Sequence, residues 1–279
     1  MTHSLKKLAR QRYLIWDLLR ETDAFYLNHH LFDVDFSAIE ADRQARLNPG
    51  EPAPSYVAYA LAAYGRTLAT FRSLNSYFRR WPRARLAVYD QVDVAVTIER
   101  DFLGQRVVLL SVLTDAASRP VADIHAFLQH RRQAPLDTLA EYTVYRRLLG
   151  LPAWWRRFAF RTFCKPSPAS IQRVCGTTAF TSIGRLGSTF TTPLSPCTCT
   201  MSLGRVEPRP RAVGGTVAVR PSAWVTLTYD HRVADGADIA RAGNHLRDAL
   251  EQWNDTAATS HRPPATSRPP EDGKRGTGN

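Results

Sequence analysis

One histidine, His231, stands where a strand is expected to end and a helix to begin. Val225, Leu227 and Tyr229 alternate with polar residues, which is the period of a half-buried strand. Downstream of Gly236, apolar residues recur every three or four positions, as on a helix that packs against that strand. A histidine held by a sheet can be aimed precisely, and an ordinary pKa near ~6.5 lets it exchange a proton at neutral pH. His231 is therefore a candidate general base.

The string from His231 through Asp235 to Gly236 fits two interpretations when taken alone. The imidazole either transfers protons, or it is a structural side chain bonded to a neighbouring carboxylate. The surrounding sequence favours the first, because five stretches in order resemble the catalytic domain of dihydrolipoamide acyltransferases of 2-oxo acid dehydrogenase complexes. These stretches are Gly176–Gly184, Thr192–Leu194, Leu203–Glu207, Pro208–Pro210 and Thr228–Arg232. Thinner matches lie upstream at Asp33–Ser37, Arg43, Leu74–Asn75, Asp93–Val96 and Ile124–His125.

This resemblance implies an α/β fold of the chloramphenicol acetyltransferase type, an α+β two-layer sandwich in which a mixed sheet packs against helices. It implies acyl transfer between a coenzyme A thioester and a thiol of the lipoyl type, or a small hydroxyl or amine, with His231 as the base. The motif aspartate, Asp235, would fix the local structure through an ion pair with an N-terminal arginine. Arg12 occupies the position that resembles that arginine, and a solvent-exposed helix arginine is the alternative interpretation of Arg12.

The resemblance also places Thr181 where these enzymes have a serine that donates a hydrogen bond to the developing oxyanion. A threonine hydroxyl can donate the same bond, although its methyl group can crowd the tetrahedral intermediate. The adjacent Ser182 is the second candidate, and both hydroxyls can instead satisfy backbone groups near a turn. Because members of the family are trimers in which base and oxyanion donor come from different chains, we expect a homotrimer with active sites between subunits.

The substrates and partners follow from the same comparison. Coenzyme A or acyl-CoA is the implied substrate, and no metal is expected. The sequence contains no lipoyl domain or subunit-binding domain, so no covalently bound lipoyl group is expected on this chain and a lipoyl group would come from a separate carrier. Two other functions stay open: a catalytically silent trimeric scaffold that binds a partner or an acyl thioester, and a membrane-associated acyltransferase.

Composition narrows the class of protein. The net charge of +12 suits nucleic acid, an anionic membrane or the phosphates of coenzyme A. Specific nucleic-acid binding is the weakest of the three, because the arginines are spread out and no groove-reading motif occurs. The four cysteines are expected to be buried thiols, with Cys197 and Cys199 on one face of a strand. No segment is long enough to span a bilayer and no secretory signal is evident, so a cytoplasmic location is expected.

Length and the resemblance indicate one acyltransferase-like catalytic domain over residues 1–253, and the polar composition of residues 254–279 predicts a disordered tail. Helices are expected at 5–21, 38–46, 55–72 and 121–130, and strands at 31–36, 86–99 and 106–113, with turns at Gly104 and Gly214–Gly215. Ser37 and Glu40 form a capping-box pattern, and Ser55 can cap the next helix. The segment 137–165 is helical, basic and aromatic, and does not match the family well. It is interpreted either as a helix packed on its own domain or as one lying on a membrane surface.

Overall fold

A mixed sheet forms the centre of the protein. The computed structural model describes residues 12–47, 52–80, 83–102, 105–164 and 167–254. The strands of the sheet are β1 (Leu27–Asp35), β4 (Val94–Phe102), β5 (Gln105–Leu113), β6 (Thr178–Ser182), β7 (Cys199–Leu203), β8 (Glu207–Val213) and β9 (Thr216–Asp230). Their order is β1-β9-β7-β6-β4-β5, with β8 paired to β9. Only β6 is parallel to its neighbours, β4 and β7, and every other pair is antiparallel.

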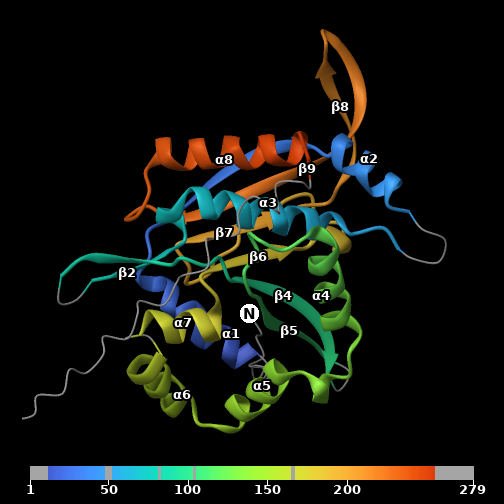
Figure 1. Cartoon of the computed structure of the whole chain (residues 1–279). Helices are drawn as coiled ribbons and strands as arrows, with labels where there is room; N and C mark the ends of the chain where they lie inside the picture. Colours follow the sequence, from blue (N-terminus) through green and yellow to red (C-terminus); the bar gives the residue numbers. More distant parts are fainter. Residues whose placement is uncertain (1–11, 48–51, 81–82, 103–104, 165–166, 255–279) are drawn as a thin grey trace, which may run out of the picture.

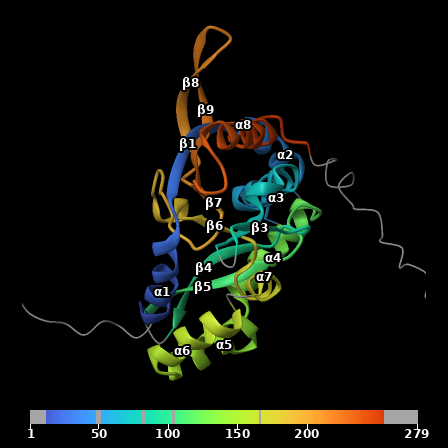
Figure 2. The ribbon, with the colours of Figure 1, turned by 90° about the vertical axis from the view of Figure 1, so that its left-hand side faces the viewer.

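Helices cover one face of this sheet. The α-helices are α1 (Arg12–Leu19), α2 (Ser37–Ala45), α3 (Tyr56–Thr70), α4 (Val121–Gln133), α5 (Ala140–Gly150), α6 (Ala153–Ala159), α7 (Pro168–Cys175) and α8 (Gly236–Glu251). A 3-10 helix, η1 (Arg20–Ala24), follows α1, and a π-helix, η4 (Phe160–Cys164), follows α6. Figure 1 shows α3 and α8 running across the strands, and Figure 2 shows both on one side of the sheet. The predicted α/β two-layer fold is confirmed.

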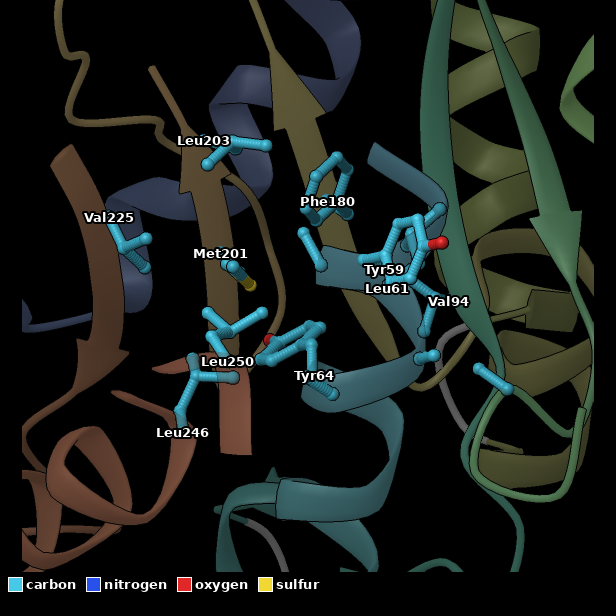
Figure 3. Packing of buried hydrophobic residues seen from close by; sticks show 14 of the residues in the cluster. Tyr59, Leu61, Tyr64, Val94, Phe180, Met201, Leu203, Val225, Leu246 and Leu250 are labelled. Atoms are coloured by element: carbon cyan, nitrogen blue, oxygen red, sulfur yellow. The ribbon is translucent and has the colours of Figure 1, made fainter. Parts of the chain in front are cut away.

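The core lies between α3 and the sheet (Figure 3). Every residue of α3 from Ala58 to Leu68 is buried, because its alanines let the helix sit close to neighbouring elements. Phe180 and Met201 reach this core from β6 and β7. The buried phenol of Tyr64 is satisfied by the Thr178 hydroxyl at 2.5 Å, which ties α3 directly to the strand that carries Thr181.

The hairpin of β8 and β9 projects beyond the sheet, at the top of Figure 1. The predicted turn at Gly214 and Gly215 is confirmed, with φ values of +57° and +83° that favour glycine. Val217 and Val219 on this arm are 78% and 71% exposed. The arm therefore exposes apolar side chains to solvent outside the core.

Two capping predictions are wrong. Ser37 does not cap α2: it begins the helix, and both its amide and its hydroxyl donate to Asp35 Oδ1, at 2.8 and 2.6 Å. Ser55 does occupy the N-cap position of α3, but its hydroxyl makes no capping bond. The Ser55 amide instead donates to Nδ1 of His125 at 3.1 Å. Asp35 therefore takes the Ser37 hydroxyl, whereas the buried Ser55 hydroxyl has no hydrogen-bond partner among the described residues.

Other boundaries also differ from the sequence prediction. Residues 86–88 belong to β3 (Arg85–Val88), which pairs with β2 (Ser76–Arg79) in a separate two-stranded sheet, instead of leading into β4. The antiparallel pair of β4 and β5 is confirmed, although the turn at Gly104 lies outside the described residues. Residues 137–164 are helical as predicted, whereas residues 1–11 and the predicted tail beyond 254 lie outside the described residues.

The described cysteines Cys175, Cys197 and Cys199 are thiols, but their placement differs from the prediction. Cys197 and Cys199 are buried and Cys175 is half-buried. Cys199 faces the main core on β7, whereas Cys197 precedes that strand and packs with Ala95 and Ala179 on the other side. The two thiols therefore do not share a face. Burial raises the pKa of Cys197 to about 11 and that of Cys199 to about 12, so neither is a thiolate at neutral pH.

Candidate active site

His231 lies immediately after β9, at the end of the sheet. The last register pair of β1 and β9 joins Leu27 to Asp230, and the His231 amide then donates to the Tyr26 carbonyl at 2.8 Å. The side chain is exposed. An open hollow of about 560 Å³ is lined by Tyr26, Leu27, Asn28, His231 and Arg232. The histidine that the sequence singled out therefore faces a surface where a substrate can enter.

The residues on either side of His231 hold it in place. The Asp230 side chain is fully buried and accepts two bonds of 2.9 Å from Nε of Arg232, as well as one from the Arg232 amide at 3.1 Å. The Arg232 guanidinium lies over the rings of Phe25 and Phe78, 4.9 and 4.5 Å from their centroids. An ion pair inside an aromatic cage has little freedom, so the turn that carries His231 is fixed.

Sequence reasoning missed this anchor. The Asp-x-Arg spacing was visible, but Phe25 and Phe78 come from η1-β1 and β2, far from the motif in the chain. A second imidazole nearby, His29 on β1, has a different environment: its Nδ1 is 2.8 Å from the Thr228 hydroxyl, and burial lowers its pKa. His29 is thus a structural histidine, whereas His231 is available to solvent.

Asp235 begins α8 as its N-cap. Its Oδ1 accepts from the Asp238 amide at 2.8 Å, and the Asp238 side chain accepts from the Asp235 amide at 3.3 Å, which completes a capping box. These amide bonds lower the pKa of Asp235 below its usual value. Gly236 follows with open space around its Cβ position, so packing does not require glycine there. Asp235 therefore fixes the entry into α8 through a cap.

The expected ion pair between Arg12 and Asp235 is not formed within the described part of one chain. Arg12 is exposed at the start of α1, and α1 packs on α5 and α6, away from α8. The Asp235 carboxylate is already engaged at the helix start. The cap accounts for the local order that the ion pair was expected to supply.

The two oxyanion candidates, Thr181 and Ser182, lie on opposite faces of β6. Phe180 and Val96 pair in register and point into the helix-covered core, so their successors Thr181 and Thr97 point to the other face. There the Thr97 hydroxyl donates to the Thr181 hydroxyl at 2.8 Å, which leaves the proton of Thr181 free for another acceptor. Ser182 points back to the Phe180 face. The geometry therefore favours Thr181 as the donor.

The sheet register keeps Thr181 and His231 apart within one chain. Thr181 pairs with Ser202 and Ser202 with Thr226, which is five residues before His231 on β9. At ~3.3 Å per residue and ~4.8 Å per strand, the two side chains start roughly 19 Å apart. The base must reach the attacking thiol and the oxyanion donor must reach the carbonyl oxygen of the same thioester, each within a hydrogen-bond distance of about 3 Å. One chain alone does not bring them together.

No group of three or more His, Cys, Asp or Glu side chains in the described ranges is placed to hold a metal ion. None of the described helices is long and apolar enough to cross a membrane.

Comparison with known proteins supports the resemblance drawn from the sequence. Residues 168–258 match the family model of the 2-oxoacid dehydrogenases acyltransferase catalytic domain, and this stretch includes both Thr181 and His231. A mouse dihydrolipoyllysine-residue succinyltransferase component of the 2-oxoglutarate dehydrogenase complex is 38% identical over 78 residues, 27% of this chain and 17% of its own length. A Mycoplasma pneumoniae acetyltransferase component of the pyruvate dehydrogenase complex is 37% identical over 82 residues, 29% of this chain and 20% of its own. The match thus spans a fifth or less of each relative.

The fold likeness covers more of the chain. A probable dihydrolipoamide acetyltransferase of Listeria monocytogenes superposes over 90% of this chain and 95% of its own, with a TM-score of 0.65 and 17% identity. The dihydrolipoamide acetyltransferase of Azotobacter vinelandii gives a TM-score of 0.66 and 17% identity over 89% of this chain and 92% of its own. The chain therefore has the fold of dihydrolipoamide acyltransferase catalytic domains, and its recognition from the sequence is confirmed.

Proposed function

We propose that this protein transfers acyl groups between coenzyme A thioesters and a thiol acceptor of the dihydrolipoyl type. The observation that carries the proposal is the exposed imidazole of His231, held by the buried Asp230–Arg232 pair beside an open hollow, on the fold and within the matched stretch of this family. A scaffold has no need of an imidazole fixed in that way. A small hydroxyl or amine is the second acceptor class.

The proposed reaction uses two side chains. The His231 imidazole accepts the proton of the attacking thiol as its sulfur bonds to the thioester carbonyl carbon. The carbonyl oxygen becomes an oxyanion, which accepts a hydrogen bond from the Thr181 hydroxyl. The tetrahedral intermediate collapses, the bond to the coenzyme A sulfur breaks, and the departing thiolate takes the proton from His231. The resemblance that assigns these roles is supported for Thr181 by the free proton that Thr97 leaves on it.

We further propose that each active site lies between two subunits of a homotrimer. The register argument supports this arrangement, because His231 and Thr181 are separated by about five residues and two strands in one chain. Each site would then take its base from one subunit and its oxyanion donor from the next. A separate lipoyl-bearing carrier would deliver the acceptor thiol.

Thiol release from a panel of acyl-CoA donors, with dihydrolipoamide and small alcohols as acceptors, tests the activity. The His231→Ala variant is expected to lose turnover, because the base is gone. His29→Gln serves as the matched control, since it removes another imidazole at the same end of the sheet and is expected to retain turnover. Equal loss in both variants, or turnover that survives in His231→Ala, would refute the role of His231.

Mixing two inactive variants tests the site between subunits. If His231→Ala and Thr181→Ala chains are unfolded and reassembled together in equal amounts, about a quarter of the interfaces combine an intact base with an intact donor. We therefore expect about a quarter of wild-type turnover from the mixture and almost none from either variant alone. A mixture as inactive as its components would place both residues in one chain's site and contradict the arrangement.

A catalytically silent scaffold is the other candidate, and the replacement of the family's serine by Thr181 is the feature in its favour. It predicts acyl-CoA binding without thiol release. Equilibrium binding of a non-hydrolysable acyl-CoA analogue, measured beside turnover on the same preparation, separates the two functions.

A further inference from the structure

The helix α6 directs charged side chains toward the domain and aromatic side chains toward solvent, which is the reverse of an ordinary surface helix. Arg156 is buried, with 9% of its surface exposed, and its Nε and Nη2 contact Oδ2 of Asp17 on α1 at 2.8 and 2.7 Å. Arg157 contacts Oδ1 of the same carboxylate at 2.7 Å. The charged side chains of α6 therefore face the domain, which differs from the packing of an ordinary amphipathic helix on its own domain, one of the two interpretations of this segment.

The aromatic side chains face outward as a result. Trp154 is 67% exposed and Phe163 is 68% exposed, and Trp155 and Phe158 are also exposed. They contact one another in a row, with ring centroids 5.5 Å apart for Trp154–Trp155, 5.6 Å for Trp155–Phe158 and 6.4 Å for Phe158–Phe163. We call these four residues the aromatic row. A contiguous row of exposed rings on a water-soluble surface marks a contact site.

The surroundings of the aromatic row are rich in arginine. Residues 140–164 contain five arginines and one acidic residue, Glu141. That carboxylate is engaged, because it accepts from Ser111 at 2.6 Å and lies 3.4 Å from Arg131. Exposed arginines of this region are Arg12 and Arg20 on α1 and η1, Arg146 and Arg147 on α5, and Arg161 on η4, of which Arg161 pairs with Glu21 at 3.3 Å. These elements gather in the lower part of Figure 1.

We propose that this surface docks the protein on an anionic lipid bilayer. Tryptophan and phenylalanine rings insert at the boundary between headgroups and acyl chains, and arginines bind the headgroup phosphates around them. Each arginine near an anionic surface strengthens binding by about five-fold. A second copy of this chain is a poorer occupant, because pairing the patch with itself would bring two arginine clusters together. The inference does not depend on the acyltransferase activity.

Flotation with vesicles tests the docking on the intact protein. We expect the wild type to float with phosphatidylcholine vesicles that contain phosphatidylglycerol, and to bind pure phosphatidylcholine at least about ten-fold more weakly. Trp154→Ser combined with Phe163→Ser removes the two most exposed rings without touching the core, and is expected to weaken binding about ten-fold or more. Val217→Ser combined with Val219→Ser removes equally exposed apolar side chains from the β8–β9 arm and should bind as the wild type does.

A charge variant provides an independent test of the proposal. Arg146→Glu combined with Arg147→Glu should abolish the preference for anionic vesicles while leaving the melting temperature unchanged, and added salt should weaken wild-type binding. The proposal is overturned if the wild type binds neither vesicle type, or if the aromatic and arm variants lose binding equally. It is also overturned if the aromatic variant changes the mass in solution instead, which would assign the patch to self-association.

Discussion

The Thr97 hydroxyl donates to the Thr181 hydroxyl at 2.8 Å, across the parallel pair of β4 and β6. This bond orients Thr181 and uses one of its two acceptor positions, so its own proton can point elsewhere. The β-branched side chain of Thr181 already restricts its rotamer. The pair therefore holds a preorganised donor on the face of the sheet opposite to α3.

Thr97→Val should lower kcat and leave KM nearly unchanged. Valine keeps the shape but removes the donor to Thr181, so the hydroxyl can turn away from the oxyanion. We expect a loss of about three- to ten-fold, smaller than the ~10²-fold loss from deleting the donor itself in Thr181→Ala. Thr181→Ser keeps the hydroxyl and should stay within a few-fold of wild type. A steady-state kinetic series of the three variants checks this order, and a Thr97→Val enzyme as active as wild type would contradict it.

Arg232→Met should destabilise the fold strongly. It leaves the fully buried Asp230 carboxylate without its cation, and an uncompensated buried charge costs about 3 kcal/mol or more. Urea denaturation of the purified variant measures the free energy of unfolding. The double variant Arg232→Met with Asp230→Asn should recover part of the loss, because no buried charge remains. Equal destabilisation of single and double variants would mean that the aromatic cage, not the ion pair, sets the stability.

Asp235→Asn should behave much like the wild type, whereas Asp235→Ala should lower the melting temperature. Asparagine is as good an N-cap as aspartate, and alanine cannot accept the Asp238 amide. Melting curves and turnover of both variants check the role. If Asp235→Asn loses activity but keeps a normal melting temperature, the expected ion pair with an arginine, and not the cap, would explain why an aspartate is needed at position 235.

The stability of the fold should fall as the pH drops below ~6.5. Burial and the nearby Arg247 lower the pKa of His30, so protonating it costs the folded state more than the unfolded chain. Stability from a neutral buried histidine is complete above the unfolded pKa near ~6.5 and declines as pH falls toward the lowered folded value. His30→Leu should flatten the free energy of unfolding across this window. A variant whose stability falls as steeply as that of the wild type would assign the effect to His29 or His125, whose pKa values are also lowered.

Around His231 the sequence alone predicted the secondary structure, because the relevant contacts there are local. The change of period around His231 predicted the end of β9 and the start of α8, and Asp235 lies at the expected helix start. Contacts between distant segments were not predictable: nothing in the chain order joins Thr97 to Thr181, or Phe78 to Arg232. For the same reason the motif could suggest a donor on β6 but not its separation from His231, which follows from strand order.

Ser37 shows a second limit of local patterns. Its spacing to Glu40 matched a capping box, yet Asp35 lies close enough to take the Ser37 hydroxyl, and Glu40 is held by Arg43 and Tyr56. The direction of α6 has a related cause. A hydrophobic pattern alone places the aromatic side toward the interior, but the half-buried carboxylate of Asp17 on α1 pairs with Arg156 and Arg157. A nearer acceptor in the chain overrode the pattern at Ser37, and an acid on another helix overrode it at α6.

The helix α6 is held by the carboxylate of Asp17 and lies outside the stretch that matches the family. The two parts of the chain are therefore under different structural constraints. The family match begins at residue 168, just after η4 ends, and contains the strands and the turn that hold Thr181 and His231. The rings of the aromatic row belong to none of the buried clusters of the described residues, and α6 pairs with Asp17 on α1, which also lies outside the matched stretch. Substitutions can therefore accumulate along the outer side of α6 without disturbing the catalytic fold.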